Sequence, residues 1–579
     1  MDKKVYEFIA TQTGEKIEEW RTCPNCGQEF AITDKDLEFY KKISPVFNGT
    51  KYEIPAPTLC PDCRQQRRLA WRNERKLYKR KCDLTNKPMI SMYSEDSKFK
   101  VYSLEAWWSD KWDPMDYGRG FDFSRSFFEQ FGELLLDVPQ VNLSVLNMEN
   151  SDYNNQSWTM KNCYLMFNCN FDENCAYGKW VNYSNRAYDS YKCYGLQNTY
   201  ECIDCHNSYK LFYSQQCVNC NESYFLYDCQ NCKNCYGCKN INWKQYMFFN
   251  KQLTREEYYI KLSEYLKKPI SDQRKETDNH FLKYPIRYIF DYNSANVAGD
   301  FITNSKNTLF VFDVDQVEDS KYVADCYESN NLMDVCYFGM NLSYSYYSTT
   351  VGIHSSKIYF SVDCWSNVSD IYYSVSCVNN CKNLFWCSGL KDKQYCILNK
   401  QYTKEEYQEL LPKIIEHMKN TWERWEFLHP NISLFGYNET NGMEYYPMEK
   451  ETALSKWYKR QDKEYPINVP EGIETVNAKD FPDNIHDVDD SILKKAVLCE
   501  ITGKPFRIVA PELEFYRKHS LPLPKRHPDQ RHLDRMTRRW GRQFYLRTCD
   551  NCGKQVVSVY SADSEFKVYC EECYNKETY

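Results

Sequence analysis

The sequence predicts a multidomain, mainly β protein in which duplicated zinc-ribbon or treble-clef-like α+β modules flank two β-solenoid repeat blocks, each capped by a helix. Three observations predict this fold class. The central residues repeat with a short period, both ends of the chain carry paired Cys-x-x-Cys motifs, and the two ends match each other. With 579 residues the chain is long enough for several domains.

The first repeat block has a period of twelve residues. When residues 163–241 are written in rows of twelve, one column reads Tyr164, Ala176, Tyr188, Tyr200, Phe212, Tyr224 and Tyr236. A constant register of this kind arises when one structural unit stacks on copies of itself. Short β-branched and aromatic runs between Asn, Ser and Asp residues favour strands and tight turns. A second block, from about Tyr346 to Leu390, repeats with a period of thirteen.

The sequence leaves open whether one coil of the solenoid holds one repeat or two. We favour two, roughly 24 residues per coil, because a coil of twelve residues has no interior room for tyrosine in a close-packed core.

The segment CQNCKNCYGC has the spacing of an iron–sulfur or metal-binding motif. In the repeat, however, Cys229, Cys232, Cys235 and Cys238 fall into four separate columns. We therefore predict that they pack as small apolar groups. A ferredoxin-type run also carries a proline after its last cysteine, where this chain has Lys239.

Each repeat block ends in the same way. NKQLTREEY and NKQYTKEEY place Thr254 three residues before Glu257, and Thr403 three before Glu406, which are capping boxes that begin helices. A helix protects the last edge of a strand stack. The predicted domains are therefore a first solenoid with its helical cap over 161–268, a linker over 269–305, and a second solenoid with its cap over 306–428.

Both ends carry four cysteines with the spacing of a zinc site. The predicted metal ligands are Cys23, Cys26, Cys60 and Cys63 near the N-terminus, and Cys549, Cys552, Cys570 and Cys573 near the C-terminus. Zinc prefers such tetrahedral thiolate sites, which close small modules. We predict two structural Zn²⁺ ions, an N-terminal zinc module over 1–122 and a C-terminal one over 496–579. A helical connector over 123–160 and an extended tether over 429–495 complete the chain.

The two terminal modules are copies of each other. LEFY occurs at Leu37 and Leu513, and YSEDSKFKVY at Tyr93 matches YSADSEFKVY at Tyr560. The alignment implies that each copy has lost one of two metal sites. In the N-terminal copy, the residues that align with the four C-terminal ligands are Cys82, Thr85, Ser103 and Ala106. In the C-terminal copy, the residues that align with the four N-terminal ligands are Cys499, Thr502, His527 and Gln530.

A strongly basic segment, RQQRRLAWRNERKLYKRK, follows Cys63, and its charge is retained in the C-terminal copy. A helix that follows a zinc knuckle and carries arginines and aromatic residues is typical of proteins that contact RNA. The predicted nucleic-acid-binding residues are Arg64, Arg67, Arg68, Arg72, Arg75, Lys76, Arg535, Arg538, Arg539 and Arg542. The alternatives are a solvated helix face, pairing with the acidic residues near Asp483–Asp490, or pairing with an acidic protein partner.

The formal net charge is −6, so any affinity for nucleic acid must come from local patches. The first residues show no signal-peptide pattern, and no apolar stretch is long enough to cross a membrane. We predict a cytoplasmic protein in which the 29 cysteines ligate metal or pack in the core instead of forming disulfides.

At CPDCRQQRRLAWRNERKLYKRKCD, WWSDKWDPMDYGRGFDFSRSFFEQF and the twice-used NKQ(L/Y)T(R/K)EEY, the chain resembles a family of large zinc-ribbon, tyrosine- and cysteine-repeat proteins from small-genome environmental bacteria. The resemblance covers essentially the whole chain. It implies four-cysteine modules at both ends, and it implies no activity, because none is established for the family.

No Gly-rich phosphate loop, nucleophile elbow or HExxH motif is present. Carboxylates along the solenoid could cut a polymer, although turn aspartates explain them equally well; the candidates are Asp189, Asp204, Asp228, Asp325, Asp334, Asp363 and Asp370. We expect His354 to be a structural histidine. The sequence thus predicts a non-enzymatic RNA-binding protein without a small-molecule substrate; the alternatives are a protein-assembly scaffold and, third, a polymer hydrolase.

Overall fold

The computed structural model describes residues 1–463, 465, 469–539 and 541–578, which fall into two compact units. The first unit contains Met1–Ser144, Arg287–Asp462 and Arg542–Ser564. The second contains Val145–Ile286, Lys463–Gly541 and Glu565–Tyr579. Each unit is described by itself. Within the described ranges, every helix is too short or too polar to cross a membrane.

The first solenoid lies in the second unit, and each of its coils holds one repeat of twelve residues. Tyr209 pairs with Asn221 and Tyr224 with Tyr236 in parallel register, so neighbouring coils are one repeat apart. The prediction of two repeats per coil is therefore wrong. The reason given for that prediction, that a coil of twelve residues has no interior room for tyrosine, agrees with the structure. The interior cluster contains no tyrosine, and the tyrosine column lies on the outside of the coil. The strands are β9 (Val145–Glu149), β10 (Ser157–Lys161), β11 (Asn170–Glu173), β12 (Lys179–Asn182), β13 (Asn185–Tyr188), β14 (Tyr191–Tyr194), β15 (Gln197–Tyr200), β16 (Tyr209–Phe212) and β17 (Asn221–Tyr224).

A period of three residues underlies the period of twelve. From Asn147 to Phe249 every third residue has a positive φ, and the residue that follows it faces the interior. Asparagine and aspartate tolerate this left-handed conformation better than other residues that have a Cβ, which explains why they recur along the block. Four such triplets close one coil, so the coil is narrow and four-sided.

The four cysteines of CQNCKNCYGC are the four interior residues of adjacent triplets. All four side chains are buried, and each thiol donates to the carbonyl oxygen two residues before it, as Cys229 does to Tyr227 at 3.3 Å. Interior side chains also accept the inward-facing N–H groups of the next coil. Cys205 N donates to Cys193 Sγ at 3.5 Å, and Cys220 N donates to Ser208 Oγ at 3.0 Å. The packing prediction is confirmed, and these contacts add a hydrogen-bonding role for thiols and hydroxyls.

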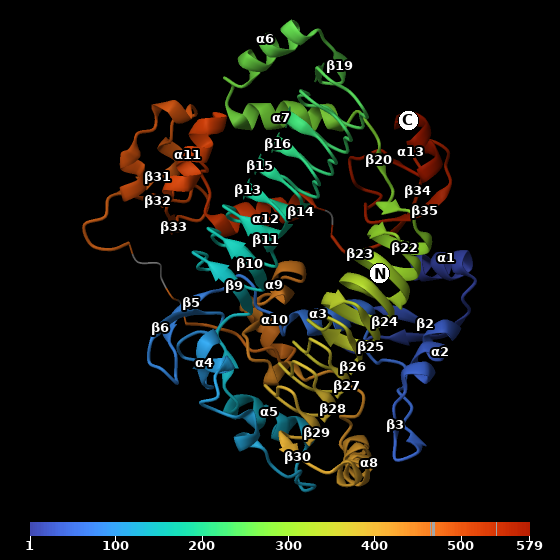
Figure 1. Ribbon diagram of the computed structural model, residues 1–579. Coiled ribbons are helices and arrows are strands. Elements are labelled where there is room, and N and C mark those ends of the chain that lie inside the picture. The colour runs from blue at the N-terminus through green and yellow to red at the C-terminus, as the bar shows by residue number, and fades with distance from the viewer. Residues whose placement is uncertain (464, 466–468, 540, 579) are drawn as a thin grey trace. The chain divides into compact units, whose positions relative to one another are not determined.

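The second solenoid lies in the first unit, and its coil length varies. Asp291 pairs with Ile302, Phe312 with Ala324, and Ser356 with Ser369, which are eleven, twelve and thirteen residues apart. The long strands β23 and β24 continue around the corners of the coil (Figure 1). The strands are β21 (Asp291–Tyr292), β22 (Ala295–Thr303), β23 (Lys306–Lys321), β24 (Ala324–Met340), β25 (Leu342–Thr349), β26 (Ser355–Tyr359), β27 (Ser369–Tyr372), β28 (Lys382–Phe385) and β29 (Gln394–Ile397).

Helices close both strand stacks as predicted. Each begins with a complete capping box, Thr254 with Glu257 for α6 (Arg255–Tyr265) and Thr403 with Glu406 for α8 (Lys404–Asn420). Short strand pairs precede them, β18 (Met247–Phe248) with β19 (Lys251–Gln252), and β29 with β30 (Lys400–Gln401). The predicted linker over 269–305 is wrong, because it contains helix α7 (Ile270–Phe281) and the first strands of the second solenoid.

The N-terminal module belongs to the first unit, together with the second solenoid. Its elements are α1 (Lys3–Thr13), β1 (Ile17–Thr22), β2 (Glu29–Thr33), α2 (Asp34–Ile43), β3 (Val46–Phe47), β4 (Thr50–Lys51), α3 (Pro61–Leu69), β5 (Tyr78–Lys81), β6 (Pro88–Ser91), β7 (Val101–Tyr102), α4 (Leu104–Trp108), α5 (Phe127–Asp137) and β8 (Gln140–Val141). The predicted helical connector over 123–160 is correct only for α5, because β9 and β10 already belong to the first solenoid.

The predicted extended tether over 429–495 is also wrong for its described residues; 464 and 466–468 lie outside them. Helices α9 (Asn441–Tyr445) and α10 (Lys450–Ser455) occur there, Tyr437 is buried, and Asn441 N donates to Arg72 O at 2.9 Å. The remaining elements are β31 (Thr475–Asn477), β32 (Ala496–Leu498), β33 (Pro505–Phe506), α11 (Ala510–His519), α12 (Pro528–Arg538), β34 (Tyr545–Thr548), β35 (Gln555–Ser558), β36 (Val568–Tyr569) and α13 (Glu571–Thr578).

The interior hydrogen bonds predict how the first solenoid responds to substitution. Replacing Cys193 by Ser should change the free energy of unfolding little, because a hydroxyl can both donate to Tyr191 O and accept from Cys205 N. Cys193→Ala leaves that N–H without a partner and should cost about 1–3 kcal/mol. Cys193→Leu overfills the coil and should cost at least as much. Urea unfolding monitored by circular dichroism checks the order; a serine variant as unstable as the leucine variant would contradict it.

Candidate metal centres and arginine clusters

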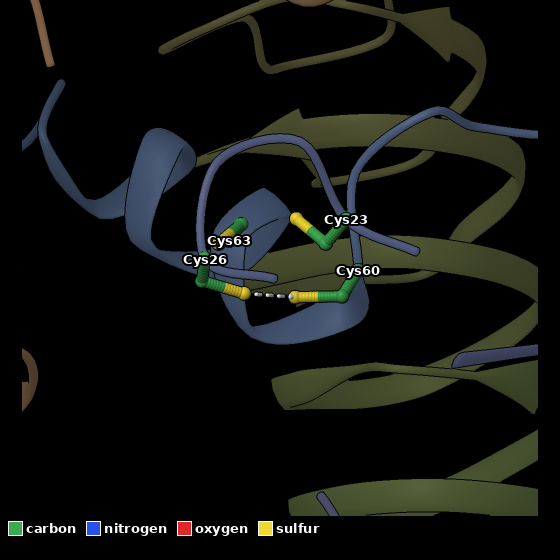
Figure 2. Close-up of side chains that lie close together, drawn as sticks. All are labelled: Cys23, Cys26, Cys60 and Cys63. Carbon is green, nitrogen blue, oxygen red and sulfur yellow. Dashed lines mark hydrogen bonds between the residues drawn. The ribbon is translucent and has the colours of Figure 1, made fainter. Parts of the chain in front are cut away.

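Four cysteine thiols of the N-terminal module form a compact group. Cys23 and Cys26 lie in the turn between β1 and β2, and Cys60 and Cys63 lie at the start of α3 (Figure 2). Their sulfur atoms all lie within 4.8 Å of one another, and the Sγ atoms of Cys26 and Cys60 are 3.6 Å apart. Sulfur ligands about 2.3 Å from a tetrahedral zinc ion have comparable separations. The geometry is compatible with a structural metal site.

The local backbone positions these thiols before any metal binds. Cys23 N donates to Gln28 O at 2.8 Å, Gly27 N donates to Cys23 O at 2.8 Å, and Gly27 takes the left-handed conformation that this turn requires. Asn25 Nδ2 donates to Cys63 Sγ at 3.2 Å. Hydrogen bonds from Cys60 and Cys63 hold the pKa of the Cys23 thiol far below its ordinary value, while the bond with Cys23 raises the pKa of Cys63 to about 12. The lowered pKa of Cys23 favours the thiolate form, which is the form that binds a metal ion.

The C-terminal ligand set is the second such group. Cys549, Cys552, Cys570 and Cys573 also have their sulfur atoms within 4.8 Å of one another. In the described part of the chain, these two groups are the ones with metal-site geometry. The number of four-cysteine sites agrees with the sequence prediction; zinc as the metal remains a prediction.

The two lost sites keep the shape of a metal knuckle. Cys82 N donates to Lys87 O at 2.9 Å and Cys499 N to Lys504 O at 3.0 Å, as Cys23 N and Cys549 N do in the intact sites. In place of a metal bond, Cys82 Sγ accepts from Ser103 N at 3.2 Å. Four knuckles of one design confirm the duplication of the terminal modules.

The predicted nucleic-acid-binding arginines of α3 lie against the second solenoid. Arg64 Nε and Arg68 Nη1 donate to the two carboxylate oxygens of Asp334 at 2.8 and 3.1 Å, and all three side chains are at most 1% exposed. The Arg64 guanidinium also lies over the ring of Tyr322. One solenoid aspartate thus binds two arginines that are one helical turn apart.

The second unit repeats this arrangement with the other copy. Arg531 and Arg535 of α12 both donate to Asp189 of the first solenoid, the second at 2.7 Å, and the Asp189 side chain is fully buried. The Arg531 guanidinium lies over Tyr177, one coil before Asp189, as Tyr322 is one coil before Asp334. Each module therefore docks on a solenoid through the same two-arginine, one-aspartate cluster, which we call the arginine clamp.

Most of the other predicted arginines are also engaged within the chain. Arg67 donates to Phe427 O at 2.7 Å, Arg72 to Thr350 Oγ1 at 2.7 Å, Arg539 to Asp204 at 3.0 Å, and Arg542 to Asp325 at 2.6 Å. Burial and the neighbouring Arg274 lower the pKa of Arg538 to about 10. Arg75 is partly exposed and Lys76 is exposed.

The placement corrects the sequence interpretation of the basic helices. Arg64, Arg68, Arg72, Arg535 and Arg542 are buried, so these guanidinium groups are not presented to phosphates in this structure. Intramolecular pairing, the alternative to RNA binding, is the arrangement observed. Four of these arginines pair with solenoid aspartates, namely Arg64, Arg68, Arg535 and Arg542, and Arg72 pairs with Glu74. The predicted acidic segment is also used, since Lys525 pairs with Asp483 and Arg517 with Asp490.

The candidate catalytic aspartates are corner residues of the coils. Each of the seven has a positive φ, as turn aspartates do. Four of them form ion pairs with arginines, namely Asp189, Asp204, Asp325 and Asp334. Asp228 accepts a hydrogen bond from the Tyr574 hydroxyl, and Asp370 forms an ion pair with Lys357. His354 is exposed at a left-handed corner, so the expectation of a structural histidine is not supported.

A cavity of about 470 Å³ lies in the first unit. Its lining includes Phe310, Phe312, Phe544, Arg68 and Arg542, and also Asp62 at the start of α3. Its described lining contains no histidine, cysteine or serine.

Comparisons with known proteins add little. No protein-family model matches the chain, and no curated protein is similar to it in sequence. A solved structure described as an acetyltransferase of Desulfovibrio desulfuricans G20 aligns with 48% of this chain and 81% of its own at 8% identity and a TM-score of 0.10. A TM-score this low supports no statement about fold or function.

We predict that the purified protein contains two zinc ions per chain. Cys26→Ser should remove one of them, because it takes away one of four ligands from a site that has no other donor of this kind. Mass spectrometry of metals after gel filtration measures the stoichiometry. Cys82→Ser and Cys499→Ser are matched controls and should leave the metal content unchanged; loss of metal in either would show that a vestigial knuckle still binds an ion.

We predict that the arginine clamp is among the strongest contributors to stability. Asp334→Ala leaves two buried guanidinium groups without their carboxylate and should lower the free energy of unfolding by about 3–5 kcal/mol. Adding Arg64→Met and Arg68→Met to that variant should restore part of the loss. Glu38→Ala removes an exposed ion pair with Lys35 and serves as the control, with an expected effect of at most about 1 kcal/mol. Thermal unfolding that does not distinguish Asp334→Ala from Glu38→Ala would contradict this role.

Proposed function

We propose that the protein is a non-enzymatic scaffold in which two metal-binding modules brace two β-solenoids and the outer wall of the first solenoid binds a protein partner. The observation that carries the proposal is the arginine clamp. In both copies, the basic helix turns its charge toward a solenoid aspartate, which is what a structural brace requires and the opposite of what a phosphate-binding helix requires.

The wall of the first solenoid supplies the surface for such a partner. Phe171, Tyr183 and Tyr194 are 45–53% exposed and form one continuous stack, with ring centroids 4.7 and 5.0 Å apart. We call these three residues the aromatic stripe. Exposed aromatic side chains with few rotatable bonds are typical anchors of protein interfaces. Around the stripe, ladders of asparagine side chains such as Asn150, Asn162 and Asn174 bond to one another from coil to coil, which stiffens the wall.

RNA binding, the function that the sequence favours, is the second candidate. The exposed lysines of the N-terminal module favour it, since Lys76, Lys79 and Lys81 lie close together on and beside β5. Phosphates attract such a cluster in a salt-dependent way. A cytoplasmic, reducing location is part of both proposals, in which the cysteines ligate metal or pack in the core instead of forming disulfides.

The test is co-purification of the tagged chain without oxygen and at low salt. Tyr183→Ser with Tyr194→Ser should abolish recovery of the specific proteins that accompany the unaltered chain, while Trp422→Ser, which removes a 91% exposed ring outside the stripe, should retain them. Partners that remain after nuclease support the scaffold. Identical partner sets in both variants would contradict it.

The same preparation decides the second candidate. Bound RNA raises the ratio of absorbance at 260 nm to that at 280 nm, falls away with salt, and should disappear in a variant carrying Lys76→Glu, Lys79→Glu and Lys81→Glu. RNA could instead persist in this variant and be lost only when Arg64→Glu and Arg68→Glu are introduced into a protein that still folds. That result would show that the buried arginines become accessible, and the brace interpretation would then be wrong.

A further inference from the structure

A second cavity of the first unit has walls of tyrosine. It has a volume of about 280 Å³ and lies between the coils of the second solenoid, the β3–β4 hairpin and the start of α8. Its aromatic lining is Phe47, Tyr344, Tyr359, Tyr372, Tyr395 and Tyr407. A volume of this order holds a small ligand of one or two rings.

The rings form a continuous platform. Tyr359 and Tyr372 occupy successive coils and stack with centroids 4.9 Å apart and an interplanar angle of 14°. Phe47 of the hairpin meets Tyr372 edge-on at 5.4 Å, and Tyr395 meets Tyr407 at 5.7 Å. Tyr344, at the open side, is 37% exposed. Tyr359 and Tyr372 are at most 3% exposed, so Tyr344 offers the aromatic face for a ligand, while the stacked rings hold the wall of the cavity in place.

Polar groups of several kinds interrupt this platform. Asp370 and Lys357 line the cavity as an ion pair 3.6 Å apart, and Asn383 adds an amide that can both donate and accept. Tyr407 is 3% exposed, and its hydroxyl has no hydrogen-bond partner among the residues that the structure describes. A buried hydroxyl of this kind is normally satisfied, so it indicates a hydrogen-bonding ligand or water at this place.

An anion is a poorer fit, because both lysines of the lining are already engaged with neighbouring groups. Lys357 is neutralised by Asp370, and Lys42 donates to Asn331 Oδ1 at 2.7 Å while it lies over the Tyr344 ring. A purely apolar ligand fits no better, since it would cover Asn383 and the buried Tyr407 hydroxyl without offering either a hydrogen bond. The groups present call for a neutral molecule with an apolar ring face and many hydroxyl groups at its edge.

We propose that this cavity is a saccharide-binding site that takes a neutral pyranose ring. The C–H face of the sugar stacks on Tyr344 and its neighbours, and the equatorial hydroxyl groups donate to Asp370 and exchange hydrogen bonds with Asn383. The proposal goes beyond the scaffold function and does not depend on it, because the aromatic stripe and this cavity belong to different solenoids.

The test uses the full-length protein and four neutral disaccharides: maltose, cellobiose, lactose and diacetylchitobiose. Saturation-transfer NMR at millimolar sugar should show transfer to the ring C–H protons of at least one of them. For that sugar, Tyr344→Ala should weaken binding about tenfold, by loss of the stacking face. Asn383→Ala should weaken it about fivefold, by loss of a neutral hydrogen bond.

Tyr209→Ala is the matched control, because it removes a tyrosine of the other solenoid that is 37% exposed, as Tyr344 is, and it should leave sugar binding unchanged. Circular dichroism confirms that each variant is folded. Absence of transfer to all four sugars overturns the proposal. So does binding that survives Tyr344→Ala and Asn383→Ala, or displacement of the sugar by millimolar inorganic phosphate, which would identify an anion site. The co-purification results for the aromatic stripe are independent of each of these outcomes.

Discussion

The arginine clamp is the interaction on which the rest of the structure depends. One buried aspartate at a corner of a solenoid coil binds two arginines separated by one helical turn, and a tyrosine of the preceding coil covers the first guanidinium. Taking three charged groups out of water is costly, and their mutual attraction compensates for that cost only when all three are present in the right geometry. The clamp therefore specifies one coil and one helix register, which a purely hydrophobic contact along a repeating surface would not do. Repetition makes neighbouring coils nearly equivalent, and a buried ionic contact distinguishes among them.

The clamp also determines which parts of the chain fold together. Arg64 lies 270 positions before Asp334 in the sequence, and Arg531 lies 342 after Asp189, so each clamp joins a helix of a terminal module to the solenoid farther from it along the chain. Within a solenoid the contacts are local, one coil apart. Such coils can form in sequence before the ends arrive, whereas the contacts of the modules require the closure of long loops. We infer that metal-bound modules and solenoids form first and that docking through the clamp completes each unit.

The two lost metal sites show how much of a module's shape the metal provides. The knuckles at Cys82 and Cys499 keep the same backbone hydrogen bonds as the complete four-cysteine groups, although three of four ligand positions in each carry other residues. A turn closed by its own backbone, and covered by docked aromatic and arginine side chains, no longer requires a bound ion. In the complete groups the four sulfur atoms converge within 4.8 Å of one another.

Much of this protein was determined by local sequence signals that act over a few residues. The Cys-x-x-Cys pairs identified both metal groups, the capping boxes at Thr254 and Thr403 identified the helices that close the solenoids, and the column spacing identified the repeats. The period of three was also present in the sequence, in the very spacing of Cys229 to Cys238, and it indicates a coil of four short sides. The outward placement of tyrosine, the direction of the basic helices and the partner of each arginine were decided only by the tertiary structure. A run of arginines has the same composition whether it faces a phosphate or a buried carboxylate, and the aspartate that decides between them lies hundreds of residues away.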